Sequence, residues 1–224
     1  MTQRIRVSTL AAIALTVAGA SPVFAAARPS CAGPAEVSNV HVLRAEQNGV
    51  LVIEDGRAVK LEGLRLPEGK ADKAPKFLAG QAVAMLNELT HGRRVTLSVH
   101  RPKQDRYGRL RAQVFITGDA REPWLQIAML ERGLARVDIA PDRPECAKEL
   151  YAAEQRARIN HYGIWALDAY AVRGPQTVGA YTGTFQIVEG KVVDAVVKGG
   201  RAYLNFGADW RTDFTATITA EDMA

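Results

Sequence analysis

Two turn dipeptides place the strongest constraint on how this chain can fold. Asn48-Gly49 and Asp55-Gly56 divide residues 38–63 into three short runs rich in Val, Ile and Leu. Both dipeptides favour tight hairpin turns, because Asn, Asp and Gly tolerate the positive φ that such turns require. Residues 38–63 are therefore predicted to form three strands joined by hairpins.

From residue 77 the apolar spacing changes to that of a helix. Leu78, Ala82, Met85, Leu86 and Leu89 fall on one helical face, and Gly92 follows where a helix would stop. Residues 93–99 and 110–117 are predicted as two further strands, joined by a basic loop. Two more helices are expected, over 124–131 after Pro123 and from Pro144 to just before Gly163, while residues 64–75 are expected to be a loop.

Five short strands with one helix between the third and fourth are typical of a small closed Greek-key barrel of the oligonucleotide/oligosaccharide-binding (OB) type. The predicted fold class is thus mainly β with α: a five-stranded barrel with three helices over residues 38–166. A linker is expected at 167–180, and a β-rich segment at 181–224.

The C-terminal segment has strand candidates at 185–188, 191–198, 201–206 and 213–219, with Gly199-Gly200 as a hairpin loop. Six aromatic residues fall between Tyr181 and Phe214. We interpret them as core, because Phe214, Ala216 and Ile218 share one strand face; the alternative is a platform on which bases stack. About 45 residues are marginal for an independent fold. The segment must therefore dock on the first domain, or the chain ends before this fold is complete.

Residues 1–25 resemble a secretory signal. Arg4 and Arg6 precede an apolar run at 7–20, and Val23-Phe24-Ala25 supplies small residues for cleavage near Ala25. The run is shorter than the roughly 20 residues that a bilayer-spanning helix requires, and no later stretch approaches that length. We therefore expect an exported protein, periplasmic or secreted, without a membrane span and with an N-terminal extension at 26–37.

Export changes the interpretation of the two cysteines, Cys31 and Cys146. In an oxidising compartment such a pair favours a disulfide, with two free thiols or an intermolecular bond as the alternatives. The formal net charge of +5 falls to +3 once Arg4 and Arg6 are removed, leaving 27 basic against 24 acidic residues. This moderate basic excess permits nucleic acid as a partner but does not require it.

Four segments in order resemble staphylococcal-nuclease-like (thermonuclease) domains over roughly residues 38–166. They are VKLEGLRLPE (59–68), DRYGR (105–109), LERGLARV (130–137) and AEQRARINHYGIW (153–165). The resemblance implies the same barrel and the calcium-dependent hydrolysis of DNA and RNA phosphodiester bonds. In that family the cation and two arginines neutralise charge on the phosphate, and a glutamate positions or deprotonates the attacking water.

Carried over residue by residue, the resemblance assigns the glutamate to Glu68 and one phosphate arginine to Arg109. The other phosphate arginine falls on Lys60, which keeps the charge but loses the bidentate fork. Arg106 and Tyr107, beside Asp105 and Gly108 in the DRYGR loop, are candidate substrate-binding residues. The alternative for Glu68 and Arg109 is a structural ion pair at the barrel edge.

The metal ligands of the family are not matched. Arg65 stands where the family has an aspartate two residues before the proline, and Gly49 replaces the other carboxylate; Glu46 would reach the site only after a register shift. Two like charges about 4 Å apart repel by roughly 4 kcal/mol at an effective dielectric of 20. We therefore expect no calcium or other metal, and consider Arg65 as a substrate-binding cation in its place.

Three functions remain open. The first is an exported thermonuclease-like protein with a degenerate site, which binds nucleic acid or another partner with weak or no cleavage. The second is an active nuclease, independent of metal or with altered metal use, that relies on Glu68 and Arg109. The third is an envelope structural or interaction module. Expected partners are single-stranded DNA or RNA through phosphates, and a protein through the C-terminal segment.

Overall fold

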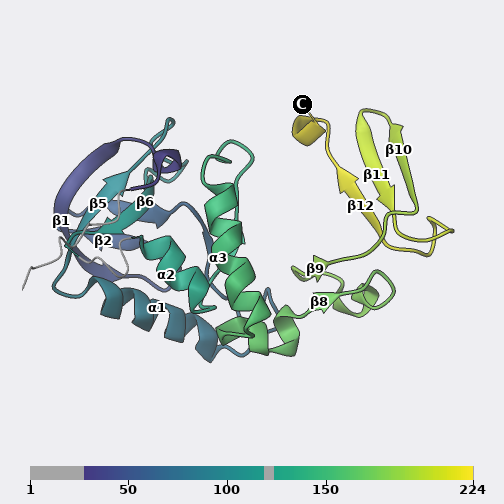
Figure 1. Cartoon of the computed structure of the whole chain (residues 1–224), viewed down its shortest axis with the longest axis horizontal. Helices are drawn as coiled ribbons and strands as arrows, with labels where there is room; N and C mark the ends of the chain where they lie inside the picture. Colours follow the sequence, from purple (N-terminus) through teal and green to yellow (C-terminus); the bar gives the residue numbers. More distant parts are fainter. Residues whose placement is uncertain (1–27, 119–123, 224) are drawn as a thin grey trace, which may run out of the picture.

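A closed five-stranded barrel forms the centre of the described part of the chain. The computed structural model describes residues 28–118 and 124–223 (Figure 1). The barrel order is β1-β2-β3-β6-β5, with β3 and β6 parallel and the other strand pairs antiparallel. The strands are β1 (Ala35–Ala45), β2 (Leu51–Ile53), β3 (Ala58–Leu61), β5 (Arg94–Ser98) and β6 (Leu110–Ile116). The predicted OB-type barrel is confirmed.

The barrel forms because alternate strand residues turn apolar side chains inward. Leu51, Ile53, Val59, Val95 and Leu97 are fully buried, and each comes from a strand that the sequence pattern predicted. The glycines of both predicted hairpin turns have positive φ, 77° at Gly49 and 84° at Gly56. The turn chemistry therefore sets the strand pairing that builds the core.

Three α-helices accompany the barrel, as expected. They are α1 (Phe77–Thr90), α2 (Leu125–Glu131) and α3 (Ala147–Ile159). Of the predicted helical face in α1, Leu78, Ala82, Leu86 and Leu89 are buried, and Met85 packs on the core while only partly buried. In the cartoon α2 lies beside α3. Pro123, the expected start of the second helix, and the predicted signal peptide lie outside the described residues.

The short sheet formed by β4 (Gly63–Arg65) and β7 (Arg136–Asp138) was not predicted. β4 pairs antiparallel with β7, so part of the expected loop at 64–75 is a strand. Three residues are too few to display an alternating pattern, which explains why the sequence did not indicate either strand. The pairing sets Arg65 opposite Arg136 and Gly63 opposite Asp138.

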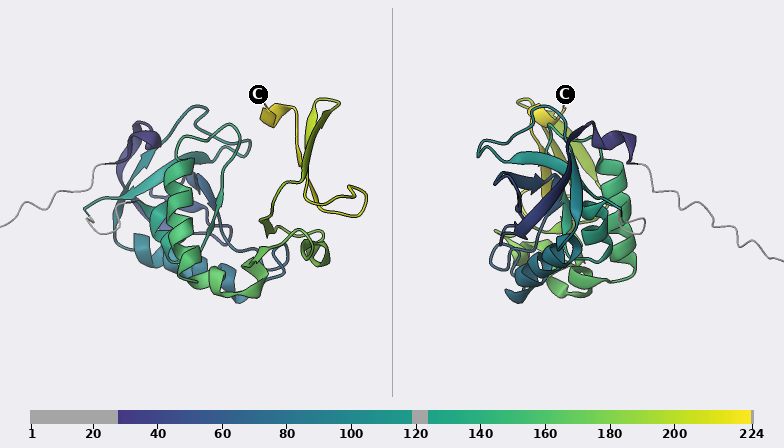
Figure 2. Two further views of the ribbon diagram at one scale, coloured as in Figure 1. Left: turned by 45° about the vertical axis from the view of Figure 1, so that its right-hand side comes forward. Right: turned by 90° about the vertical axis from the view of Figure 1, so that its left-hand side faces the viewer.

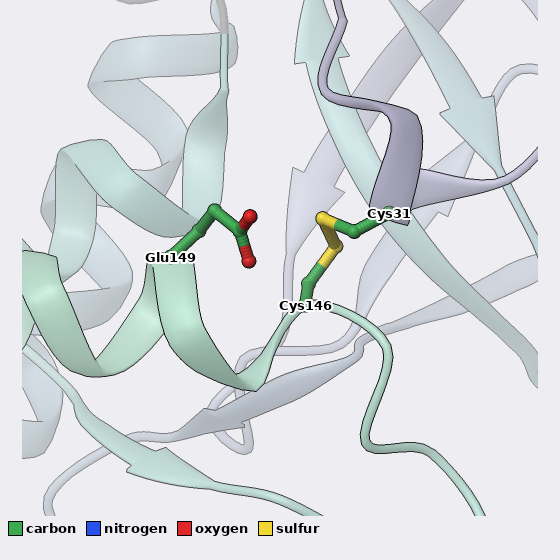
Figure 3. Close-up of side chains that lie close together, drawn as sticks. All are labelled: Cys31, Cys146 and Glu149. Carbon is green, nitrogen blue, oxygen red and sulfur yellow. A yellow bond between two sulfur atoms is a disulfide. The ribbon is translucent and has the colours of Figure 1, made fainter.

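The predicted disulfide joins Cys31 to Cys146 (Figure 3). It ties the N-terminal extension, through the 3-10 turn η1 (Ser30–Ala32), to the residue that precedes α3. Glu149 lies beside it, with a carboxylate oxygen within 4.8 Å of both sulfurs. Because the two sulfurs are bonded to each other, they offer no thiolates for a metal ion.

The segment expected as a linker is folded against the residues that follow α3. It holds the short elements η3 (Asp168–Tyr170), β8 (Val172–Arg173) and η4 (Val178–Tyr181), after η2 (Gly163–Ala166) and before β9 (Ile187–Val188). Tyr170 is buried in a cluster with Ile164 and Trp165, and Ile187 packs on the same cluster.

A three-stranded sheet of order β10-β11-β12 follows, and Figures 1 and 2 show it standing apart from the barrel. Its strands are β10 (Asp194–Lys198), β11 (Arg201–Asn205) and β12 (Thr215–Ile218), before η5 (Glu221–Met223). The predicted Gly199-Gly200 hairpin is confirmed. The six aromatics of this region do not form a buried core: each is half-buried or exposed, because a single small sheet has no second layer to cover them.

No helix in the described ranges is long and apolar enough to cross a membrane.

Candidate functional site

A cleft of about 500 Å³ opens beside the C-terminal end of β3. Its walls come from the β1–β2 turn, from β3, β4 and the loop that follows, from α1 and from β7. The polar side chains that line it are Gln47, Asn48, Lys60, Arg65, Glu68 and Asp138. The cleft thus brings together three of the residues singled out in the sequence: Lys60, Arg65 and Glu68.

Arg65 and Glu68 are joined to each other. Nη2 of Arg65 lies 3.2 Å from Oε1 of Glu68, three residues further along the chain. Nε of Arg65 is buried and has no hydrogen-bond partner in the described residues. The candidate base therefore already holds a cation, and the cleft contains two basic and two acidic side chains rather than a basic surplus.

The two positions that carry metal carboxylates in the resembling family do not fit a calcium ion here. Gly49 has no side chain, and a Cβ built on it would lie 2.9 Å from Cδ1 of Leu66, which is buried. Arg65 presents a guanidinium, whereas calcium takes several oxygen ligands. Glu46 is engaged elsewhere, since its Oε1 lies 3.1 Å from Nη2 of Arg44.

The DRYGR loop is held by an ion pair of its own. Nη2 and Nε of Arg109 lie 2.7 and 2.8 Å from Oδ2 of Asp105, while Oδ1 accepts the backbone N–H groups of Tyr107 and Arg109. Burial by itself would raise the pKa of Asp105, but these hydrogen bonds outweigh it and lower that pKa. Arg109 is not among the residues that line the cleft.

Tyr107 projects from this loop with 66% of its surface exposed. The guanidinium carbons of Arg106 and Arg109 lie 4.8 and 4.9 Å from its ring centroid, within cation–π range. An exposed aromatic ring flanked by guanidinium groups can stack on a nucleobase and attract the phosphates beside it. The predicted substrate-binding pair Arg106 and Tyr107 is therefore accessible.

Arg111, which the sequence interpretation missed, lies on the strand beside Lys60 and does not line the cleft. It pairs in register with Lys60 across β3 and β6, and its buried guanidinium bridges two carboxylates. Nε lies 2.6 Å from Glu62 Oε2, and Nη1 lies 2.6 Å from Asp142 Oδ2. The hydrogen bonds that Arg111 donates to Asp142 and Glu62 raise the pKa of Arg111 above its ordinary value. Lys60, by contrast, forms no ion pair within the described ranges.

Asp72 was also not predicted from the sequence, although it holds the loop that carries Glu68 in place. It is 1% exposed, and its Oδ2 accepts the backbone N–H of Glu68 at 2.9 Å. Its Oδ1 accepts a hydrogen bond from Nη2 of Arg136 at 2.9 Å. The Arg136 guanidinium in turn lies 3.6 Å from the ring centroid of Phe185, so residues beyond the barrel cover this contact.

Residues 58–167 match the model of the family described as staphylococcal nuclease homologue. A search of curated proteins found no match to this chain. The matched range begins at β3 and spans β6, the three helices and the candidate cleft residues from Lys60 onward. This match supports a nuclease-like or nucleic-acid-binding domain. Residues 58–167 therefore form a domain that is similar to staphylococcal nuclease homologues.

Proposed function

We propose that this protein binds single-stranded nucleic acid through its phosphates and cleaves it weakly or not at all. The observation that carries the proposal is the Arg65–Glu68 ion pair at 3.2 Å. The guanidinium faces one carboxylate oxygen of Glu68, and that oxygen must give up this partner before it can accept a proton from water. The site therefore keeps basic groups suited to phosphate while its candidate base is occupied.

Contact with the substrate is assigned to the accessible basic and aromatic groups. Lys60 lines the cleft without an ion-pair partner in the described chain, and Arg106 and Tyr107 are exposed on the neighbouring loop. Lys60 would neutralise one phosphate, and Tyr107 would stack on a base. Arg109 would act chiefly by shaping the loop through Asp105.

The protein is proposed to work without calcium, because Gly49 and Arg65 supply no carboxylates at the family's ligand positions. It is also proposed to act after export. The Cys31–Cys146 disulfide supports an oxidising compartment, since structural disulfides persist there.

Fluorescence anisotropy with labelled single-stranded DNA and RNA tests binding. Affinity should fall steeply between about 50 and 200 mM salt, and Lys60→Ala should weaken binding and reduce the salt slope by about one. Lys191→Ala is the matched control, because it removes the same charge from an exposed position outside the cleft. Equal losses in the two variants would contradict a phosphate contact at Lys60.

Cleavage is followed on the same substrates in calcium, in magnesium and in chelator, beside Glu68→Gln. We expect no difference between the protein and Glu68→Gln in any condition. Rapid, complete cleavage that disappears in Glu68→Gln would show an active enzyme and overturn the proposal. Its persistence in chelator would then favour a metal-independent nuclease that uses Glu68 and Arg109.

A further inference from the structure

The strand β10 is an unpaired sheet edge. It borders the β10-β11-β12 sheet, and all five of its residues are exposed, with Val196 and Val197 at 44% and 71%. An edge strand of this kind offers a row of free peptide groups to another strand. Natural sheets protect such edges with proline, bulges or charged side chains. β10 contains no proline and no bulge, and its charged residues, Asp194 and Lys198, stand only at its two ends.

The same sheet has one face that is wholly apolar. The strand register places six apolar residues on that face: Ala195, Val197, Ala202, Leu204, Ala216 and Ile218. None of the six is buried. A small sheet gains stability from added strands, because each new strand pairs its edge and shelters its neighbours. The sheet therefore has both an edge strand without a neighbour and an apolar face without a covering layer in the described structure.

The sequence of β10, Asp-Ala-Val-Val-Lys, is complementary to itself when it is reversed. Alternate residues of a strand direct their peptide groups to the same edge, so an antiparallel partner must meet residues of matching parity. A two-fold axis that passes between two residues sets odd-numbered residues opposite even-numbered ones and so breaks this rule. An axis that passes through a residue sets odd opposite odd and even opposite even, and so obeys it. Among these axes, one through Val196 sets Asp194 of each copy opposite Lys198 of the other.

We propose that β10 pairs antiparallel with β10 of a second copy of this chain, about a two-fold axis at Val196. The pairing would join two three-stranded sheets into one of six strands. Ala195 would then face Val197 of the second copy, which extends the apolar face across the junction.

Charges within one copy support the same partner. Lys198 stands directly opposite Arg201 in the β10–β11 hairpin, and like charges opposite each other are unfavourable. Among the residues that the structure describes, the Asp194 carboxylate makes only a long contact, 3.5 Å from Nδ2 of Asn205. Asp194 of a second copy would supply the negative charge that Lys198 lacks beside it.

Cysteine cross-linking tests the axis. Residues opposite each other on antiparallel strands have Cβ atoms close enough for a disulfide after small adjustment. Val196→Cys should therefore give a covalent dimer on a non-reducing gel after mild oxidation, since the native cysteines are bonded to each other. Val197→Cys is more exposed but faces residue 195, so it should cross-link far less. Equal cross-linking of the two variants would overturn the proposed axis.

Charge exchange tests the register in the otherwise unmodified protein by sedimentation velocity. Asp194→Lys and Lys198→Asp should each weaken dimerisation about tenfold or more, because both pairs across the axis become repulsive. The double exchange should restore the dimer, and Thr217→Lys on the opposite edge strand should leave it unchanged. A protein that stays monomeric over a wide concentration range would refute the pairing. So would a dimer indifferent to the exchanges, which would instead be held by the apolar face.

Discussion

The Tyr170 hydroxyl donates a hydrogen bond to Oδ2 of Asp72 at 2.6 Å, although 98 residues separate them in the chain. The same oxygen accepts the backbone N–H of Glu68. Tyr170 lies in the segment after the last helix, so this contact connects residues beyond the barrel to the loop that carries the candidate base. Burial, together with the hydrogen bond to Asp72, raises the pKa of Tyr170.

Tyr170→Phe removes this donor while keeping the ring in its cluster. We expect a loss of about 2 kcal/mol in the free energy of unfolding, because a buried carboxylate loses one of its partners. Urea unfolding measures the change. Tyr162→Phe is the control, since Tyr162 is 54% exposed and should give little change. Equal effects of the two substitutions would show that Tyr170 does not support Asp72.

Alkaline pH should weaken the folded state through Tyr170. Its pKa lies above the ordinary value of 10 in the folded protein, so above that pH the unfolded chain loses a proton that the folded chain keeps. Unfolding is then favoured as pH rises. The stability advantage of the wild type over Tyr170→Phe should be complete below about pH 10 and should shrink above it. Urea titrations at several alkaline pH values test this, and a constant difference would contradict it.

Local patterns in the sequence predicted most of the fold. The two hairpin glycines and the helical face of α1 are signals within a few residues, and each appears where expected. β4 and β7 were missed because each has three residues and is defined by a partner more than seventy residues away. The C-terminal aromatics were interpreted as core because their strand pattern is apolar, yet a pattern cannot show whether a second layer exists to cover it.

The candidate site was predictable in part, because some of its residues are close together in the sequence. Lys60, Arg65 and Glu68 share a cleft because they lie on one short stretch of chain. The placement of Arg111 between Glu62 and Asp142 depends on long-range pairing. Lys60 on β3 and Arg111 on β6 are partners in the parallel register, but no local pattern in the sequence shows that these two strands pair.

Arg111→Met should be among the most damaging substitutions in the barrel. It leaves Glu62 buried without its cation, which costs about 4 kcal/mol in comparable buried pairs. Asp142→Asn is the control: it weakens the other half of the bridge, but the Asp142 side chain is 55% exposed and water can replace the contact. In chemical denaturation, Arg111→Met should therefore show a much lower free energy of unfolding than Asp142→Asn. A similar stability for the two variants would argue that Glu62 does not depend on Arg111.

Loss of the Cys31–Cys146 disulfide should lower the free energy of unfolding about as much as Arg111→Met does. Cys31 and Cys146 are 115 residues apart, and opening a loop of that length releases about 4 kcal/mol of unfolded-state entropy. Denaturation of the Cys31→Ser, Cys146→Ser double variant measures this loss directly. Adding a reductant should lower the stability of the wild type but not of the variant. A reductant effect that persists in the variant would have another cause.

Gly49→Ala tests whether Leu66 occupies the space where a side chain at residue 49 would project. Gly56→Ala is its matched control, because Gly56 has a similar φ of 84° and a Cβ there meets nothing within 4 Å. Both substitutions carry the same backbone strain. The difference between their losses in the free energy of unfolding therefore isolates the contact with Leu66, for which we expect about 2 kcal/mol. Leu66→Ala should remove most of that difference when it is combined with Gly49→Ala, since the two side chains compete for one volume. If the two glycine substitutions prove equally costly, the absence of a carboxylate at residue 49 does not follow from packing against Leu66.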